Sequence, residues 1–106
     1  MIDEAEMCRR AGIKSYMLRE WIQADWIHPR SDLMGASFSD IDLARARLIR
    51  DLAGPMGVNE EGVAVILSLL DQIHGLRRAL RRMNSAVVAQ DAAVRRRIRY
   101  EASKIP

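Results

Sequence analysis

Apolar residues recur at alternating steps of three and four through the second half of this 106-residue chain. They are Ile66, Leu69, Ile73, Leu76, Leu80, Met83 and Val87. A mean spacing of 3.5 residues is the heptad pattern of a helix that packs against another helix along one edge. A helix from Asn59 to Asn84 would be about 39 Å long, longer than a domain of this size can cover from within. The pattern therefore predicts a long helix whose apolar seam meets a partner.

A second copy of the chain is the partner that this seam favours. In that arrangement the two long helices pair, parallel or antiparallel, as a coiled coil. The alternative is that Val63, Ile66, Leu69 and Leu70 pack on the N-terminal helices while the rest of the helix is an exposed arm. Both hold together if Leu70 faces inward and the residues from Ile73 onward face the second copy. The predicted dimer interface consists of Ile66, Leu69, Ile73, Leu76, Leu80 and Met83.

Two short helices joined by a tight turn are predicted at the N-terminus. Asp3 followed by Glu6 is a capping signal for a helix over residues 4–10, and Gly12 is placed to end it. Ser15 is available as the cap of a second helix over residues 15–24. Its apolar residues at helical spacing are Met17, Leu18, Trp21 and Ile22. Two helices with such a turn form a helix-turn-helix.

A small hairpin and a third helix follow. Short strand-like pieces, Trp26–Ile27 and Ser37–Phe38, surround turn-forming residues and predict an irregular hairpin, or wing. Ser39 caps the third helix, which ends at Gly54. Its predicted buried side consists of Ile41, Leu43, Ala44, Leu48, Ile49 and Leu52. Asn59 then caps the long helix by the same logic.

These elements predict an all-α fold with a minor wing, divided into three parts. Residues 1–57 form a winged helix-turn-helix domain, residues 58–84 a dimerisation helix, and residues 85–106 a basic C-terminal helix or tail.

Charge is distributed unevenly along the chain. Residues 1–76 carry 8 Lys and Arg against 12 Asp and Glu, whereas residues 77–106 carry 9 against 2. Proteins that read DNA grooves usually concentrate positive charge on the reading module, where it displaces counterions from phosphate. Here the basic character belongs to the tail alone. Its RRRIR run, residues 95–99, fits binding to nucleic acid or to an acidic partner face, or else a solvated terminal helix.

No catalytic constellation occurs in the sequence, and we expect no enzyme activity. Neither paired carboxylates, a nucleophile with its base, nor a phosphate-binding loop is present. His28 and His74 lie too far apart for a metal site, so we expect no metal and no cofactor. The lone Cys8 fits a reducing compartment, and no apolar run is long enough to span a bilayer, so we expect a cytoplasmic protein without a membrane partner.

The order of these elements resembles that of the MerR-type regulators over residues 2–84. A helix-turn-helix, a wing, a third helix opening with FSDIDL and a long helix are the shared parts. The resemblance implies a MerR-like winged helix-turn-helix fold with a long C-terminal coiled-coil dimerisation helix.

Within that group the chain is similar to the chaperone-modulator family, CbpM. The similarity lies in EMC followed by the turn GI, in Leu18, in the Phe38–Ser39–Asp40 start, and above all in GVAVILSLLDQIHGLR, residues 62–77. Members of that family bind the J-domain of a DnaJ-like, CbpA-type co-chaperone and restrain its work with DnaK. The resemblance therefore implies a J-domain partner, with inhibition by binding and without chemistry.

Two departures from MerR-type readers bear on DNA binding, which is the alternative function. Such readers present Leu-Arg-aromatic-aromatic on the second helix and an arginine between aromatics on the far wing strand. This chain has Leu18-Arg19-Glu20-Trp21, and Gly35-Ala36-Ser37-Phe38 replaces the wing arginine. A carboxylate near phosphate repels it, and a lost cation weakens binding. The remaining candidates for DNA contacts are Lys14, Arg19 and Arg30.

An acidic body suits a basic protein partner, because opposite charges steer association. The candidate partner-binding residues are Asp25, Asp32, Glu60, Glu61 and Asp71. Trp21 and Trp26, around the end of the second helix, either close the small core or anchor a partner. A dimeric scaffold without a regulatory surface is a third possibility.

Overall fold

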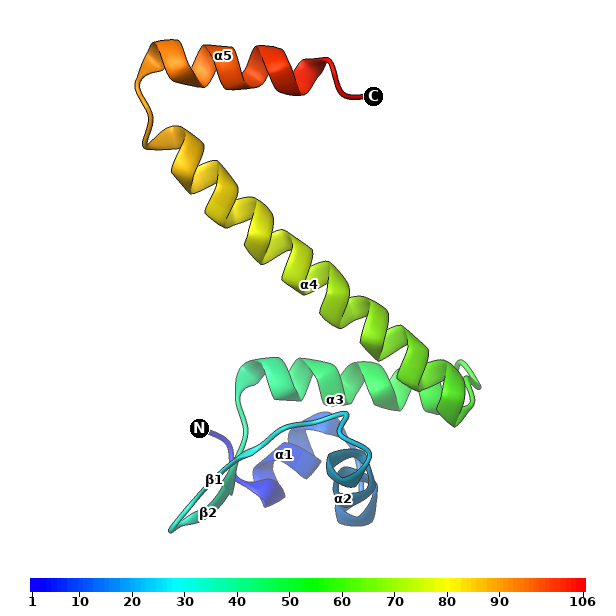
Figure 1. The fold of residues 1–106 in the computed structure, drawn as a ribbon. Helices are drawn as coiled ribbons and strands as arrows, with labels where there is room; N and C mark the ends of the chain where they lie inside the picture. Colours follow the sequence, from blue (N-terminus) through cyan, green and yellow to red (C-terminus); the bar gives the residue numbers. More distant parts are fainter. The chain divides into compact units, whose positions relative to one another are not determined.

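The computed structural model describes residues 1–106 and is mostly helical, with one two-stranded antiparallel sheet (Figure 1). This confirms the predicted all-α fold with a minor wing. Residues Met1–Leu67 and Ser68–Pro106 form two compact units, and one helix is continuous from the first into the second. The elements are α1 Glu4–Ala11, α2 Ser15–Gln23, β1 Arg30–Asp32, β2 Gly35–Ser37, α3 Asp40–Ala53, α4 Glu60–Val88 and α5 Ala92–Ser103.

Local hydrogen bonds set the limits of α1. The carboxylate of Asp3 accepts a hydrogen bond from the Glu6 amide at 2.8 Å, as the capping signal predicts. Gly12 follows the helix with φ +70°, a left-handed conformation that favours glycine, and its amide donates to the Cys8 carbonyl. The helix thus ends one residue later than predicted.

The predicted Ser15 cap of α2 is wrong. Lys14 is the N-cap residue, in extended conformation and without a side-chain cap bond, and Ser15 is the first residue of the helix. The reason is that the Lys14 carbonyl already accepts from the amides of Met17 and Leu18. Leu18 and Trp21 are the buried residues of α2.

The wing is a hairpin whose strands differ from the predicted ones. Arg30 pairs with Ser37 and Asp32 with Gly35, so the turn lies at Leu33–Met34. The Asp32 carboxylate accepts from the Met34 amide at 2.8 Å and stabilises that turn. Trp26 and Ile27 form no strand, because their amides bond back to the Trp21 carbonyl and close the end of α2. Phe38 pairs instead with Ile2 as an isolated bridge.

A capping box begins α3, as the predicted Ser39 cap requires. The Ser39 hydroxyl accepts from the Asp42 amide, while the Asp42 carboxylate accepts from the Ser39 amide. The predicted buried side is partly wrong, since Ile41 is 79% exposed and Ala44 is also exposed. The buried residues are Leu43, Ala46, Ile49 and Leu52. They recur at steps of three, and α3 packs against α1 with this face.

The core of the first unit draws on every helix in it and on the segments that flank the hairpin. Its largest fully buried side chains are Phe38, Met7, Leu18, Ile27, Ile49 and Val63. The start of α4 contributes Val63 and Leu67, whereas Ile66 and Leu70 are half-buried and Leu69 is exposed. The first turns of α4 thus pack on the N-terminal helices, as the alternative prediction requires. Val63 is buried as predicted, but Leu67 is buried rather than Leu69.

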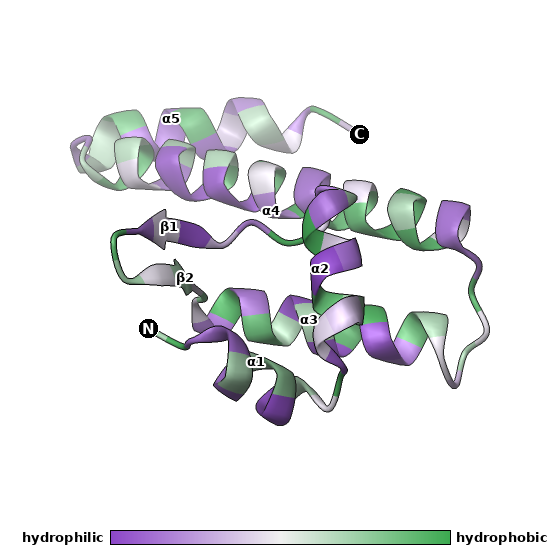
Figure 2. Cartoon of the chain, turned by 90° about the horizontal axis from the view of Figure 1, so that it is seen from below, coloured by the Kyte–Doolittle hydropathy of each residue, from purple (hydrophilic) through white to green (hydrophobic).

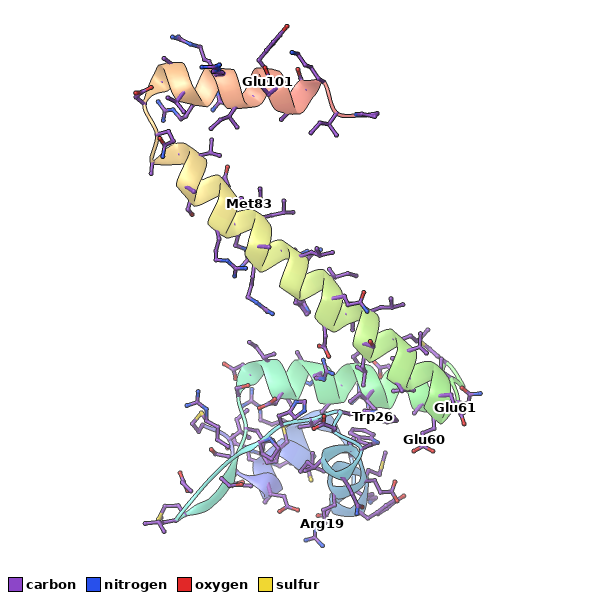
Figure 3. The ribbon with its side chains drawn as sticks, viewed as in Figure 1. Arg19, Trp26, Glu60, Glu61, Met83 and Glu101 are labelled. Carbon is purple, nitrogen blue, oxygen red and sulfur yellow. The ribbon has the colours of Figure 1, made fainter.

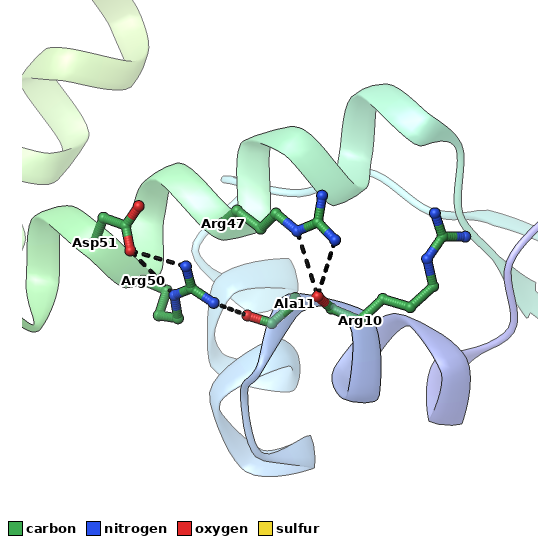
Figure 4. A network of polar contacts seen from close by, with 5 residues as sticks. All are labelled: Arg10, Ala11, Arg47, Arg50 and Asp51. Atoms are coloured by element: carbon green, nitrogen blue, oxygen red, sulfur yellow. Dashed lines mark hydrogen bonds and ion pairs between the residues drawn. The ribbon is translucent and has the colours of Figure 1, made fainter.

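Two arginines of α3 bind the C-terminal end of α1 (Figure 4). Arg50 donates to the Ala11 carbonyl at 2.6 Å and also pairs with Asp51. Arg47 donates to the Arg10 carbonyl through Nε and Nη2, at 3.3 and 3.1 Å. These carbonyls have no partner inside their own helix, and cations favour the negative end of a helix dipole. Arg47 and Arg50 are therefore engaged in holding α1 and α3 together.

The second unit consists of the rest of α4 and of α5. The long helix reaches Val88, four residues beyond the predicted Asn84. The Asp91 carboxylate accepts from the Val94 amide at 2.9 Å and caps α5, so the basic C-terminal segment is a helix. Hydrophobic and hydrophilic residues alternate around both helices (Figure 2). Neither helix, nor any other in the chain, has the length and apolar character required to cross a membrane.

Candidate functional site

The predicted dimer seam is an exposed apolar strip on α4. Ile66 is half-buried in the first unit, and the other five seam residues are 43–66% exposed within the chain. These five are Leu69, Ile73, Leu76, Leu80 and Met83. A continuous row of exposed large apolar side chains is uncommon on a monomer and typical of a contact surface. The strip can thus bury apolar area against a partner of matching periodicity.

The predicted acidic residues do not form one cluster. Asp25, which has φ +66°, bonds to His28 Nε2 at 2.7 Å, and Asp32 is engaged in the hairpin turn. Glu60 and Glu61 lie in the first turn of α4, where carboxylates favour the positive end of the helix dipole. Asp71 belongs to the second unit. Of the five, Glu60 has the setting most suited to binding, as described below.

The predicted basic residues are spread over α1–α2 and the wing. Lys14 precedes α2 and Arg30 begins β1, and both are exposed without an ion-pair partner. Arg19 Nε lies 3.4 Å from Glu4 Oε1, an ion pair that joins α2 to α1. Glu20, the neighbour of Arg19 on α2, is exposed as well. The exposed face of α2 thus carries charges of both signs.

The tip of the wing is apolar. Leu33 and Met34 are 105% and 95% exposed, so neither side chain packs on the chain. The strands beside them carry one cation, Arg30, and one carboxylate, Asp32. Such a tip offers apolar contacts rather than charge for phosphate.

A small hollow in the first unit brings together residues from α2, the segment after it and the start of α4. Its volume is about 210 Å³. Its walls include Glu20, Trp21, Trp26, Val58, Glu60 and Val63. Trp26 and Glu60 are labelled near one another in Figure 3, beside the first turn of α4. Trp21 is buried and Trp26 half-buried, so both tryptophans contribute to the core edge and to the hollow.

The sequence did not predict this hollow. Trp21 and Trp26 are the part of it that the sequence indicates. Whether they close the core or anchor a partner, both interpretations place aromatic side chains at the end of α2. The sequence does not predict that Glu60 lines the hollow. Glu60 lies about forty residues from Glu20 in the chain, and it approaches Glu20 only when α4 packs on the first unit.

Comparison with known protein families gives one finding. A family model described as "MerR HTH family regulatory protein" matches residues 2–85. Neither the curated proteins nor the solved structures contain a match to the chain.

Proposed function

This chain belongs to the MerR HTH family of regulatory proteins, and within that family we propose that it is a chaperone modulator. In this proposal it binds the J-domain of a DnaJ-like co-chaperone and restrains the co-chaperone's work with DnaK. The activity is binding by occupation of a surface and involves no chemical step. The similarity of residues 62–77 to the chaperone modulators supports this choice.

The observation that carries the proposal is the mixed charge of α2. A helix that enters the DNA groove brings its exposed face against phosphates, which repel carboxylates. Glu20 is exposed and has no cation partner within the chain, and its neighbour Arg19 is paired with Glu4. The apolar wing tip, Leu33–Met34, is equally unsuited to phosphate. A protein surface with basic and apolar groups matches these features better than a nucleic acid does.

We further propose that the chain acts as a homodimer through the apolar strip of α4. The five exposed seam residues continue the heptad spacing over about four turns, which suits a partner helix of the same sequence. Arg78 and Ser85 lie on the opposite side of the heptad, where polar residues face water. The seam would thus leave the N-terminal unit free to meet the partner protein.

DNA binding is the second candidate, and membership of the regulatory family favours it. Lys14 and Arg30, exposed and without ion-pair partners, are then the phosphate contacts, and Arg19 adds a third after exchanging Glu4 for phosphate. In a dimer the two α2 helices would read two half-sites.

Binding to the two candidate partners can be measured side by side. We expect calorimetric titration to give a saturable J-domain complex whose affinity falls as salt is raised, because the charges that face each other are opposite. We expect mobility shifts on genomic fragments to give no sequence-specific band. Absence of a J-domain complex at low salt would reject the chaperone proposal. A specific band that Arg30→Ala removes would establish the DNA reader instead.

A further inference from the structure

The hollow of the first unit has the size of a side chain rather than of a small-molecule ligand. Its volume of about 210 Å³ lies below the roughly 300–1,000 Å³ typical of small-molecule pockets. Val58, Val63 and the two tryptophans are among the residues that line it. A ligand group that fits must therefore be slender, with methylene groups to cover the valines.

The aromatic walls select for positive charge. An indole ring attracts a guanidinium or ammonium group placed over its face, by about 0.5–2 kcal/mol depending on exposure. Trp21 and Trp26 are the only tryptophans of the chain, and both line this hollow. Two indoles in one small hollow thus favour a cation over a neutral or anionic group.

Two carboxylates strengthen this preference. Glu20, from α2, and Glu60, from the first turn of α4, both line the hollow. Both are exposed, and neither has an ion-pair or hydrogen-bond partner for its side chain within the chain. A cation between them would gain attraction from each, and no Lys, Arg or His is among the residues that line the hollow.

The hollow is also held in shape before any ligand arrives. The Trp26 amide donates to the Trp21 carbonyl at 2.9 Å, and Arg45 donates to the Trp26 carbonyl. These bonds anchor the backbone that carries Trp26 to α2 and to α3. Arg45 itself is not among the residues that line the hollow. A preformed site binds more tightly because less ordering accompanies association.

We propose that this hollow receives an arginine or lysine side chain from a basic helix of the protein partner. The inference rests on the proposed function for the partner's identity. The methylene groups of the side chain contact Val58 and Val63, the indoles face its cationic end, and Glu20 and Glu60 neutralise it. The hollow is thus the anchor point of the partner surface, and the remaining acidic residues contribute long-range attraction only.

The two tryptophans allow a direct test with a small probe. Titration of the full chain with N-acetyl-arginine amide is expected to give a saturable change in tryptophan emission. The isosteric neutral probe N-acetyl-citrulline amide, at the same ionic strength, is expected to give none. Glu20→Gln/Glu60→Gln is expected to abolish the response, whereas Glu61→Gln, which alters an exposed neighbour outside the hollow, retains it. Equal responses to both probes would overturn the proposal.

Affinity for the J-domain separates this inference from the proposed function. We expect Glu20→Gln/Glu60→Gln to weaken the complex at least about tenfold and Glu61→Gln to change it less than about twofold. Both glutamates are exposed, so circular dichroism should show unchanged folding. If the double variant binds as tightly as the wild type, the hollow is not the anchor although the function stands. If the wild type does not bind the J-domain yet responds to the arginine probe, the function fails and the cation site stands.

The chain's own arginine-rich helix α5 is the competing occupant. A full-length variant with Arg95, Arg96, Arg97 and Arg99 changed to glutamine is titrated in parallel. An unchanged response to the arginine probe supports an external partner. A response that appears only in this variant overturns the assignment and gives the hollow to the tail of a copy of the chain.

Discussion

Single guanidinium groups connect parts of the first unit that are distant in sequence. Arg47 and Arg50 bind the last carbonyls of α1 from positions 37 and 39 residues further along the chain. A half-buried arginine that satisfies such a carbonyl contributes more than an exposed ion pair, because the carbonyl would otherwise lose its partner. The stability of the helix-turn-helix therefore depends in part on two arginines of α3, Arg47 and Arg50.

We expect Arg50→Ala to lower the free energy of unfolding by about 1–2 kcal/mol, because the Ala11 carbonyl loses its charged donor. Chemical denaturation followed by circular dichroism measures this change. Arg9→Ala is the matched control, since its side chain is 75% exposed and pairs only with Glu6, and should cost less than about 0.5 kcal/mol. Equal costs for the two variants would contradict the structural role of Arg50.

Among the elements, α4 has two tasks along its length. Its first turns supply Val63 and Leu67 to the core, so this part is fixed by burial. The seam residues from Leu69 to Met83 are exposed, which is typical of a surface that contacts a partner. One helix can do both because the buried pair and the seam occupy different sides of its circumference.

We expect Leu80→Glu to weaken dimerisation at least about a hundredfold, because the seam would then bury a carboxylate without a partner. Sedimentation equilibrium measures the association constant. Ser85→Glu introduces the same charge on the opposite side of α4 and should leave it nearly unchanged. A monomeric wild type at micromolar concentration would remove the basis of the seam proposal.

At the scale of the whole chain, the charge is divided between the acidic first 76 residues and the basic remainder. Helix α5 carries four arginines, all outside the helix-turn-helix. Cations of this kind bind any polyanion by releasing counterions. Binding of the full chain to DNA therefore does not by itself indicate that α2 recognises a DNA sequence in the groove.

We expect weak binding to duplex DNA of any sequence, with a slope of log K against log salt no steeper than about −4, from four α5 arginines. The full-length variant with these four arginines changed to glutamine should bind DNA more weakly and with a flatter slope, and should keep its affinity for the J-domain. Fluorescence anisotropy with two duplexes of unrelated sequence measures the affinity for DNA and its dependence on salt. DNA affinity that survives in the variant and differs between the duplexes would point to reading by α2.

The elements of this protein could be predicted because their signals are local. Asp3, Ser39 and Asn59 each cap a helix through an amide three residues on, and Gly12 ends α1 through its own conformation. The heptad seam is likewise a periodicity within one helix. Such features depend on neighbours in the chain, so sequence alone determined the helices, the winged helix-turn-helix order and the exposed strip of α4.

The tertiary structure decided what depends on distant residues. It buried Ala46 in place of Ala44 because α1 approaches α3 on that side. The first strand of the hairpin is Arg30–Asp32 rather than Trp26–Ile27, because the amides of Trp26 and Ile27 donate to the Trp21 carbonyl. The tertiary structure also joined Glu20 with Glu60 around two tryptophans. The physical reason is that these partners meet only when the core of the first unit closes, and no spacing in the sequence encodes which of several polar or small residues will face it.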